Sequence, residues 1–172
     1  MSHLTREGSM NVLSLFDGMS CGQLALQRAG VKYDNYFASE IKPIAIKVTQ
    51  HNFPDTIQLG DVKNINLKQL PKIDLLIGGS PCQDFSILKT QGKGLDGDKS
   101  KLFYEYLRIL KELKPKYFLL ENVRMKKESE QELNEYLGVK GIHINSELVS
   151  YQKRPRIYWT NIPNVNVPED RN

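Results

Sequence analysis

Short apolar segments alternate with helix-like segments along most of this chain, and this alternation restricts its fold more than any other feature. The apolar runs that predict strands are residues 12–16, 33–39, 57–59, 73–77 and 117–120. The segments that predict helices are residues 21–29, 43–52, 99–113 and 128–137. Repeated strand–helix units favour an α/β fold with a mostly parallel sheet and helices on both faces. Residues 142–149 and 157–162 alternate like two final strands, which we expect to form an antiparallel pair.

The first predicted helix has apolar residues at helical spacing, which indicates a face that packs on the sheet. These residues are Leu24, Leu26 and Ala29, and Gly30 follows as a helix C-cap. The second predicted helix begins with Pro43, which suits the first turn of a helix.

The composition is that of one globular domain. The chain has 172 residues, of which 40% are hydrophobic and 26% are charged, and its net charge of +4 permits an anionic partner such as nucleic acid. No apolar run is long enough to span a membrane, so we expect no membrane partner. Two cysteines without a signal-peptide pattern favour a reducing, cytoplasmic setting over a Cys21–Cys82 disulfide. The cysteines and the three histidines lack metal-ligand spacing, so we expect no metal.

The two ends of the chain are expected to lie outside the domain. Residues 1–9 have the composition of a cloning leader without fixed structure, and residues 164–172 are a polar tail. The domain is therefore expected to span residues 10–163. Within it, residues 83–98 are polar and glycine-rich, and such a long connection predicts a functional loop.

A cysteine follows the strand predicted at residues 73–77. Gly78 and Gly79 are expected to free the backbone there, and Pro81 fixes it just before Cys82. The thiol would then lie at the carboxyl end of a strand, where open α/β sheets bind ligands. The alternative is a small buried cysteine. A protease-like role would need a histidine partner, which none of the three histidines is placed to supply.

Three other strand ends carry residues suited to a nucleoside. Glycines in the turn that follows residues 12–16 let backbone N–H groups approach a ligand. Glu40 could accept hydrogen bonds from ribose hydroxyls, and Asp61 could accept one from an adenine amino group. Each of these residues alone is more often a solvated turn residue. Together, without a dinucleotide glycine motif, they favour S-adenosylmethionine over a dinucleotide.

Glu121 follows the strand predicted at residues 117–120. Its carboxylate could bind and protonate a ring nitrogen of a bound base, or it could cap the next helix. Arg154 and Arg156 would supply cations that favour a Cys82 thiolate, if the final strands fold back onto this site.

These motifs, in this order, resemble those of the DNA cytosine-5 methyltransferases. The resemblance rests on Phe16-Asp17-Gly18, Pro81-Cys82-Gln83, Glu121-Asn122-Val123 and Gln152-Lys153-Arg154-Pro155-Arg156, and it covers residues 10–163. The residues of these motifs are similar to those of the family branch that contains the animal de novo enzymes together with phage and bacterial proteins. The resemblance implies a Rossmann-like methyltransferase fold. Ser20 stands where many members have glycine.

The resemblance also implies roles for individual residues. Cys82 would add to carbon 6 of cytosine, Glu121 would protonate the ring nitrogen, and Arg154 and Arg156 would position the base and its phosphates. The implied S-adenosylmethionine contacts are Phe16, Asp17, Gly18, Met19, Glu40, Ile41, Asp61, Val62, Pro81 and Leu102. The implied DNA contacts are Gln83, Ser86, Lys89, Lys93, Asn122 and Gln152. The target base would be flipped out of the duplex, with residues 83–98 closing over it.

The chain ends soon after the Gln-x-Arg-x-Arg motif, whereas family members usually continue with a target-recognition region and a final motif. We therefore expect double-stranded DNA as substrate and a second chain or a further region as the source of target recognition. S-adenosylhomocysteine would be the product, in a bacterial or phage setting of restriction–modification or self-protection. Two alternatives remain at this point: a catalytically silent DNA-binding or regulatory relative, and a tRNA cytosine-5 methyltransferase.

Overall fold

The computed structural model describes residues 10–79 and 100–168, in which seven strands form one mixed sheet. The strands are β1 (Asn11–Leu15), β2 (Asn35–Ser39), β3 (Ile57–Gln58), β4 (Leu75–Gly78), β5 (Tyr117–Val123), β6 (Ile142–Asn145) and β7 (Pro155–Thr160). Their order is β3-β2-β1-β4-β5-β7-β6. Strands β1 to β5 pair in parallel, and β7 pairs antiparallel with both β5 and β6. The predicted parallel sheet with an antiparallel final pair is confirmed.

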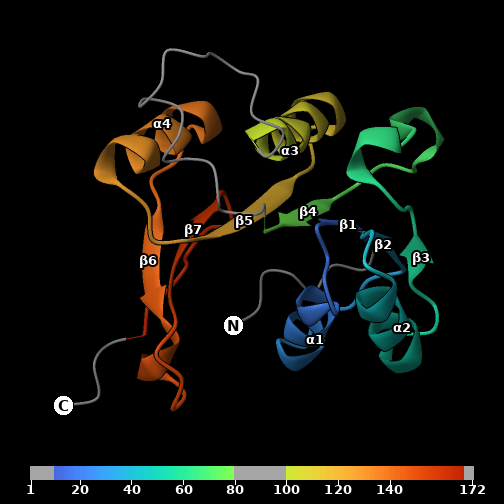
Figure 1. The fold of residues 1–172 in the computed structure, drawn as a ribbon, viewed down its shortest axis with the longest axis horizontal. Coiled ribbons are helices and arrows are strands. Elements are labelled where there is room, and N and C mark those ends of the chain that lie inside the picture. The colour runs from blue at the N-terminus through green and yellow to red at the C-terminus, as the bar shows by residue number, and fades with distance from the viewer. Residues whose placement is uncertain (1–9, 80–99, 169–172) are drawn as a thin grey trace.

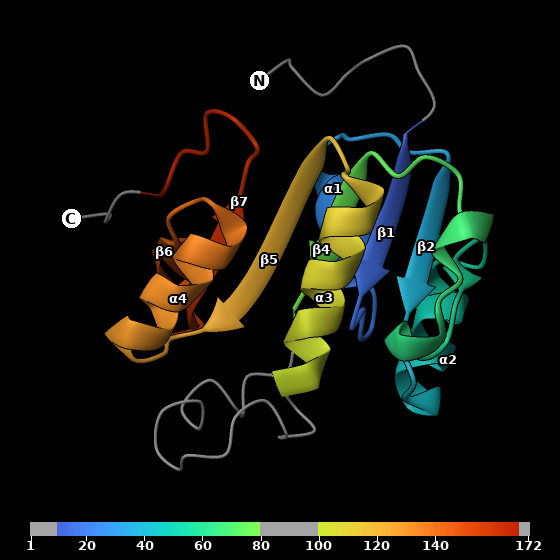
Figure 2. The same ribbon diagram turned by 90° about the horizontal axis from the view of Figure 1, so that it is seen from above.

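Helices cover both faces of the sheet, as predicted. They are α1 (Cys21–Arg28), α2 (Pro43–Asn52), α3 (Ser100–Leu113) and α4 (Lys127–Leu137), with short 3-10 turns η1 (Val62–Asn64), η2 (Leu67–Gln69) and η3 (Ser146–Leu148). Figure 1 shows α1 and α2 on one face of the sheet and α3 and α4 on the other, and Figure 2 shows the same layers from above. Within the described ranges, no helix has both the length and the apolar character needed to cross a lipid bilayer.

Two apolar clusters hold these layers together. The larger one lies between the sheet and α3 and includes Leu13, Leu76 and Tyr106, all with no exposed surface. It continues under α4, where Trp159 of β7 is fully buried and its indole N–H donates to Asn134 Oδ1 at 2.7 Å. The smaller cluster lies on the α1 face, around Tyr36 of β2. The buried apolar area on both faces is what makes the sheet a stable platform for the residues at its edge.

The first helix packs only in part as predicted, since Leu26 packs against the smaller cluster but Leu24 and Ala29 are exposed. Its one buried residue is Gln23, whereas Leu24 is 39% exposed. Gln23 Nε2 donates to Ser20 Oγ at 2.9 Å and to Thr56 Oγ1 at 2.6 Å, so a hydrogen-bonded amide takes the inward position. A buried polar side chain is tolerated when its hydrogen bonds are made, and the apolar pattern alone does not reveal such a case. Gly30 does follow the helix with φ of +68°, as a C-cap requires.

The fifth strand is longer than predicted and carries Glu121 and Asn122 within it, not beyond its end. It continues because β7 pairs with it, with Glu121 opposite Tyr158 and Val123 opposite Arg156. Since β4 ends at Gly78, opposite Leu120, the last residues of β5 project past β4. The sixth strand is shorter than predicted, because Asn145 ends it and its side chain accepts from the Glu147 N–H as the cap of η3.

Candidate active site

A cavity of about 620 Å³ lies at the carboxyl ends of β1, β2 and β4. The predicted cofactor residues that line it are Phe16, Gly18, Met19, Glu40, Ile41, Asp61, Val62 and Leu102. The lining residues that were not predicted as cofactor contacts are Ser39, Lys42, Ile44, Ala45 and Gly79. The strand order places these ends side by side, since β3, β2, β1 and β4 are consecutive neighbours. The cavity therefore occupies the position where open α/β sheets bind ligands.

The turn after β1 shapes one wall of this cavity with an unusual backbone. Phe16, Gly18 and Ser20 have φ of 57°, 61° and 61°, in the left-handed region that side chains other than glycine disfavour. Ser20 is fully buried, and its hydroxyl donates to Asp17 Oδ2 at 2.6 Å and accepts from Gln23 Nε2 at 2.9 Å. These hydrogen bonds offset the cost of the left-handed conformation. They also explain how a serine occupies a position that suits glycine.

Asp17 was predicted as a cofactor contact but does not line the cavity. Its carboxylate faces the sheet, where Tyr36 Oη donates to Oδ1 at 2.9 Å and Ser20 Oγ donates to Oδ2. Burial raises the pKa of the Asp17 carboxyl, while the hydrogen bonds from Ser20 and Tyr36 act in the opposite direction. Asp17 therefore stabilises the turn from the side that faces the sheet.

Glu40 ties the first turn to the start of α2. Its Oε2 accepts from the Gly18 N–H at 2.8 Å, and its Oε1 accepts from the N–H groups of Ile41 and Lys42 at 2.8 and 2.9 Å. A carboxylate has roughly four lone-pair sites, so these three bonds leave capacity for about one more donor. Asp61 caps η1, with Oδ1 accepting from the Lys63 N–H at 3.0 Å.

The acceptor groups and apolar side chains that line the cavity fit an adenosyl group. Glu40 and Asp61 offer carboxylate acceptors for hydroxyl and amino donors. Apolar side chains complete the lining, and two of them are unusually exposed, with Ile41 at 66% and Ile44 at 78%. Exposed apolar side chains at a cavity mouth are what a flat, largely apolar ring system would cover.

A second group of predicted residues meets at the end of β4. Arg156 Nε lies 2.6 Å from Glu121 Oε1, with the arginine 17% and the glutamate 34% exposed. The guanidinium also donates to the Pro155 carbonyl at 2.9 Å, so it is held at two points. A Cβ placed on Gly79 would lie 3.1 Å from Glu121 Oε2. Because Gly79 also lines the cavity, the Glu121 carboxylate lies at the cavity border.

The role expected for the glycine pair is wrong. Neither Gly78 nor Gly79 has a positive φ, so backbone freedom does not explain them. A Cβ on Gly78 would approach the Tyr106 ring to 2.7 Å, and one on Gly79 would crowd Glu121. Both positions need glycine for close approach, which only the tertiary structure reveals.

The remaining predicted residues are not gathered at this point. Arg154 and Gln152 are exposed, and Arg154 contributes its backbone N–H to Asn145 Oδ1 at 3.0 Å. Asn122 is 2% exposed, so its side chain does not reach the surface where a DNA contact was expected. The alternation along β5 turns it to the α3 side, opposite to Glu121. The predicted residues that lie outside the described ranges are Pro81, Cys82, Gln83, Ser86, Lys89 and Lys93.

Tyr158 is a neighbour of Glu121 that the sequence did not indicate. It is the cross-strand partner of Glu121 in the β5–β7 pair. Burial, and to a smaller extent the charge of Glu121, raise the pKa of Tyr158, while the charges of Arg156 and Arg154 lower it. The register of β7 is set by pairing, so no local signal could have placed this phenol.

Across residues 10–79 and 100–168, no three His, Cys, Asp or Glu side chains gather as metal ligands would.

Comparison with known proteins identifies the family. Residues 10–171 match the profile of the C-5 cytosine-specific DNA methylases, and the chain belongs to this family. It is 42% identical to an orphan methyltransferase of Bacillus phage SPR over 68% of this chain. It is 34% identical to the type II methyltransferase M.NgoBV of Neisseria gonorrhoeae over 86% of this chain.

Solved structures agree on the fold. The Dnmt2 methyltransferase of S. pombe superposes with a TM-score of 0.73 at 20% identity, covering 93% of this chain and 52% of that one. A Spodoptera frugiperda DNMT2 mutant gives 0.64 at 27% identity, covering 88% and 49%. The chain spans 27% of the phage protein and 40% of the Neisseria protein.

Proposed function

We propose that this chain is the catalytic part of a DNA (cytosine-5-)-methyltransferase that acts on a cytosine flipped out of the duplex. The observation that carries the proposal is the Glu121–Arg156 pair at the border of the cavity, beside Gly79. A carboxylate that can bind a pyrimidine ring thus lies next to a cavity whose acceptor groups and apolar side chains suit an adenosyl group. Cys82 follows Gly79 by three residues in the sequence.

The cavity is proposed to bind S-adenosylmethionine, which supplies an electrophilic methyl group when bound. Glu40 would use its remaining acceptor site for a ribose hydroxyl, and Asp61 would accept from the adenine amino group. Ile41, Val62 and Leu102 would contact the purine. The bonds from Glu40 to backbone N–H groups hold this arrangement before any ligand binds, which lowers the entropy lost on binding.

Cys82 is proposed as the nucleophile. Its thiolate would form a carbon–sulfur bond to carbon 6 of the cytosine, which makes carbon 5 electron-rich enough to take the methyl group. The methyl donor would leave as S-adenosylhomocysteine. The proton on carbon 5 would then pass to water, the ring nitrogen would return its added proton to Glu121, and cleavage of the carbon–sulfur bond would restore the aromatic ring and the thiolate. Glu121 would donate a proton to the ring nitrogen as the thiolate adds, and Arg156 would hold Glu121 in the required orientation.

The proposal is tested with isotopically labelled S-adenosylmethionine, a mixture of duplex DNA sequences and, separately, tRNA. We expect label in DNA for the wild type and none for Cys82→Ser. Cys21→Ser is the matched control, because Cys21 is a free and exposed cysteine at the start of α1. It should keep full activity.

Three results would contradict the proposal in different ways. Label only in tRNA would refute DNA as the substrate. Cofactor binding without label in either nucleic acid would favour the silent, DNA-binding relative. Equal label with Cys82→Ser would refute the covalent route. Trapping on a duplex that contains 5-fluorocytosine gives a direct readout, because the covalent adduct cannot lose fluorine as it would lose a proton. Target recognition by a second chain or a further region stays a prediction.

A further inference from the structure

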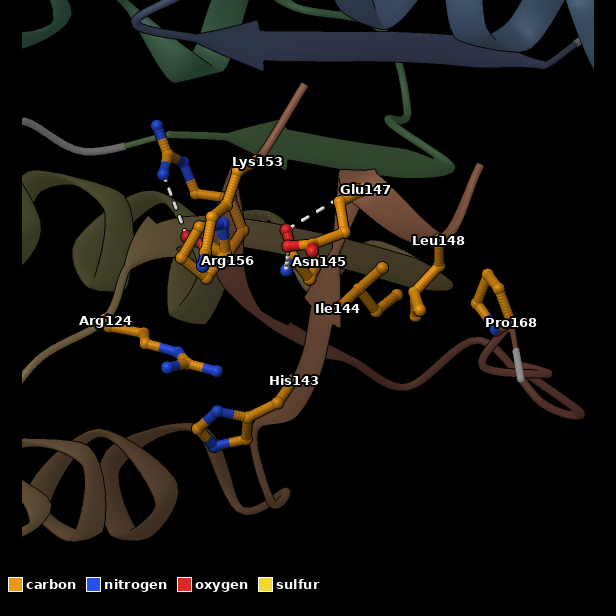
Figure 3. Close-up of a pocket in the computed structure, with 10 residues that line it drawn as sticks. Arg124, His143, Ile144, Asn145, Glu147, Leu148, Lys153, Arg156 and Pro168 are labelled. Carbon is orange, nitrogen blue, oxygen red and sulfur yellow. Dashed lines mark hydrogen bonds between the residues drawn. The ribbon is translucent and has the colours of Figure 1, made fainter. Parts of the chain in front are cut away.

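A second cavity, of about 500 Å³, lies where β5 and β6 end and β7 begins. Four charged side chains line it, namely Arg124, Glu147, Lys153 and Arg156, together with the imidazole of His143. Figure 3 shows the Arg124 guanidinium and the His143 ring projecting to the same side of this cavity. We call it the cationic groove. Lys153, Pro155 and Arg156 belong to the last of the motifs that indicated the family, whereas Arg124 and His143 belong to none of them.

The charges of the groove do not cancel. Its lining has three permanent cations, Arg124, Lys153 and Arg156, against the single carboxylate of Glu147. Arg156 is paired with Glu121, and Glu147 accepts a hydrogen bond from the Asn145 amide. His143 is hydrogen-bonded to Glu130 at 2.8 Å, outside the groove.

Among the residues that the structure describes, the two other cations, Arg124 and Lys153, have no counter-charge. Within residues 10–79 and 100–168, no carboxylate lies within ion-pair distance of Arg124 or of Lys153. Both residues are exposed, so their charges are solvated in the protein alone. A concave surface with two unpaired cations attracts an anion and raises its local concentration.

The position of the groove relative to Glu121 indicates which anion it binds. Arg124 directly follows β5, and Lys153 precedes β7, which is antiparallel to β5. Both residues therefore lie at the end of the sheet where β5 ends. Arg156 belongs to both sites, because its Nε contacts Glu121 while its side chain lines the groove. A ligand group in the groove is therefore one side chain away from the base that Glu121 is proposed to hold.

From this geometry we propose that the cationic groove binds a backbone phosphate of the DNA strand that carries the target cytosine. The inference rests on the proposed function, because it takes the nucleotide at Glu121 as its reference point. A guanidinium and an ammonium group are the usual partners of backbone phosphates, and such contacts set position and affinity without selecting sequence. Arg124 lies outside the family motifs, and Lys153 lies within the last of them but had no role assigned to it, so both are newly proposed as binding residues.

The test measures duplex binding by fluorescence anisotropy across a series of salt concentrations, with the complete chain. Arg124→Gln and Lys153→Gln each remove one charge from the groove. Lys32→Gln is the matched control, since Lys32 is an exposed lysine in the connection before β2, at the amino ends of the parallel strands, whereas β5 ends at the groove. If each groove cation contacts a phosphate, each groove variant reduces the slope of log K against log[salt] by about 0.9. Lys32→Gln leaves the slope unchanged.

The outcomes separate this inference from the proposed function. Wild-type slopes in both groove variants would overturn the inference, while trapping of the wild type on 5-fluorocytosine DNA would leave the proposed function intact. A loss of affinity that depends on DNA sequence would also overturn it, because phosphate contacts are insensitive to sequence. Failure of the wild type to bind any duplex would overturn both. Thermal unfolding of each variant verifies that the fold is kept, as expected for exposed residues.

Discussion

Two regions at the carboxyl ends of the parallel strands are proposed to hold their ligands by different means. Around the ends of β1, β2 and β3, backbone turns and buried hydrogen bonds fix the shape of the cavity, and Glu40 alone accepts three backbone N–H bonds. Around the ends of β5 and β6 and the start of β7, the site consists of long charged side chains, of which Arg124 and Lys153 are exposed. A small ligand of constant shape suits a rigid cavity. A long polyanion suits side chains that can reach and adjust.

This difference predicts how variants should separate. Changes on the β1–β3 side should alter cofactor affinity with little effect on the salt dependence of DNA binding. Changes on the β5–β7 side should do the reverse. Glu121 lies between the two sides and should affect the chemistry more than either binding step.

Glu121→Gln tests this intermediate position and has the largest expected effect. The amide cannot donate the carboxyl proton to the ring nitrogen, so methyl transfer should fall by about 10²–10⁴-fold. Cofactor affinity from isothermal titration calorimetry should stay unchanged. Glu112→Gln, on the exposed side of α3, is the control for loss of one carboxylate. Turnover within twofold of wild type would show that Glu121 has no part in proton transfer.

Glu40→Ala tests the cofactor side alone. Its removal leaves three backbone N–H groups without their acceptor and deletes the proposed ribose contact. A hydrogen bond to a charged group contributes about 1.5–3 kcal/mol, so affinity for S-adenosylmethionine should fall by about 10- to 100-fold. The salt slope of DNA binding should not change. A matching loss in DNA binding would mean that the two sides are not independent.

Gly79→Ala tests the border between the two sides. The new Cβ would lie 3.1 Å from Glu121 Oε2, so the carboxylate must shift. A small displacement of a catalytic group is expected to slow methyl transfer by about tenfold. Gly30→Ala is the control, because φ of +68° makes it strained while nothing lies within 4 Å of its Cβ. It should lower stability by about 1–2 kcal/mol without slowing turnover. Equal slowing in both variants would assign the effect to stability.

Asp17→Asn has the smallest expected effect and concerns pH. Because burial raises the pKa of Asp17, the folded protein holds a proton that the unfolded chain has already released above the ordinary carboxyl pKa. The unfolding free energy contributed by Asp17 is therefore highest at low pH and falls as pH rises through the raised pKa. Asp17→Asn should remove this slope from denaturant unfolding curves measured across the acidic range. Parallel pH profiles for both proteins would contradict the assignment.

Local patterns were sufficient for most elements of the fold. The second helix spans Pro43–Asn52 as predicted, because its starting proline and its length are local features. The strand ends that carry Gly18, Glu40 and Asp61 were also predictable, since each apolar run stops at a polar or glycine residue. Gln23 was not, because its buried position depends on Thr56, which is distant in sequence.

The sequence by itself determined the class of sheet, the family and the residue types available for chemistry, because periodicity, turn residues and motif order are properties of neighbours along the chain. Only the tertiary structure decided how these residues meet. Pairing with β7 extended β5, brought Arg156 to Glu121 and turned Asn122 inward. The same pairing brought Arg124 and Lys153 together in the cationic groove. Strand register arises from contacts between distant segments, so it cannot be deduced from the order of residues alone.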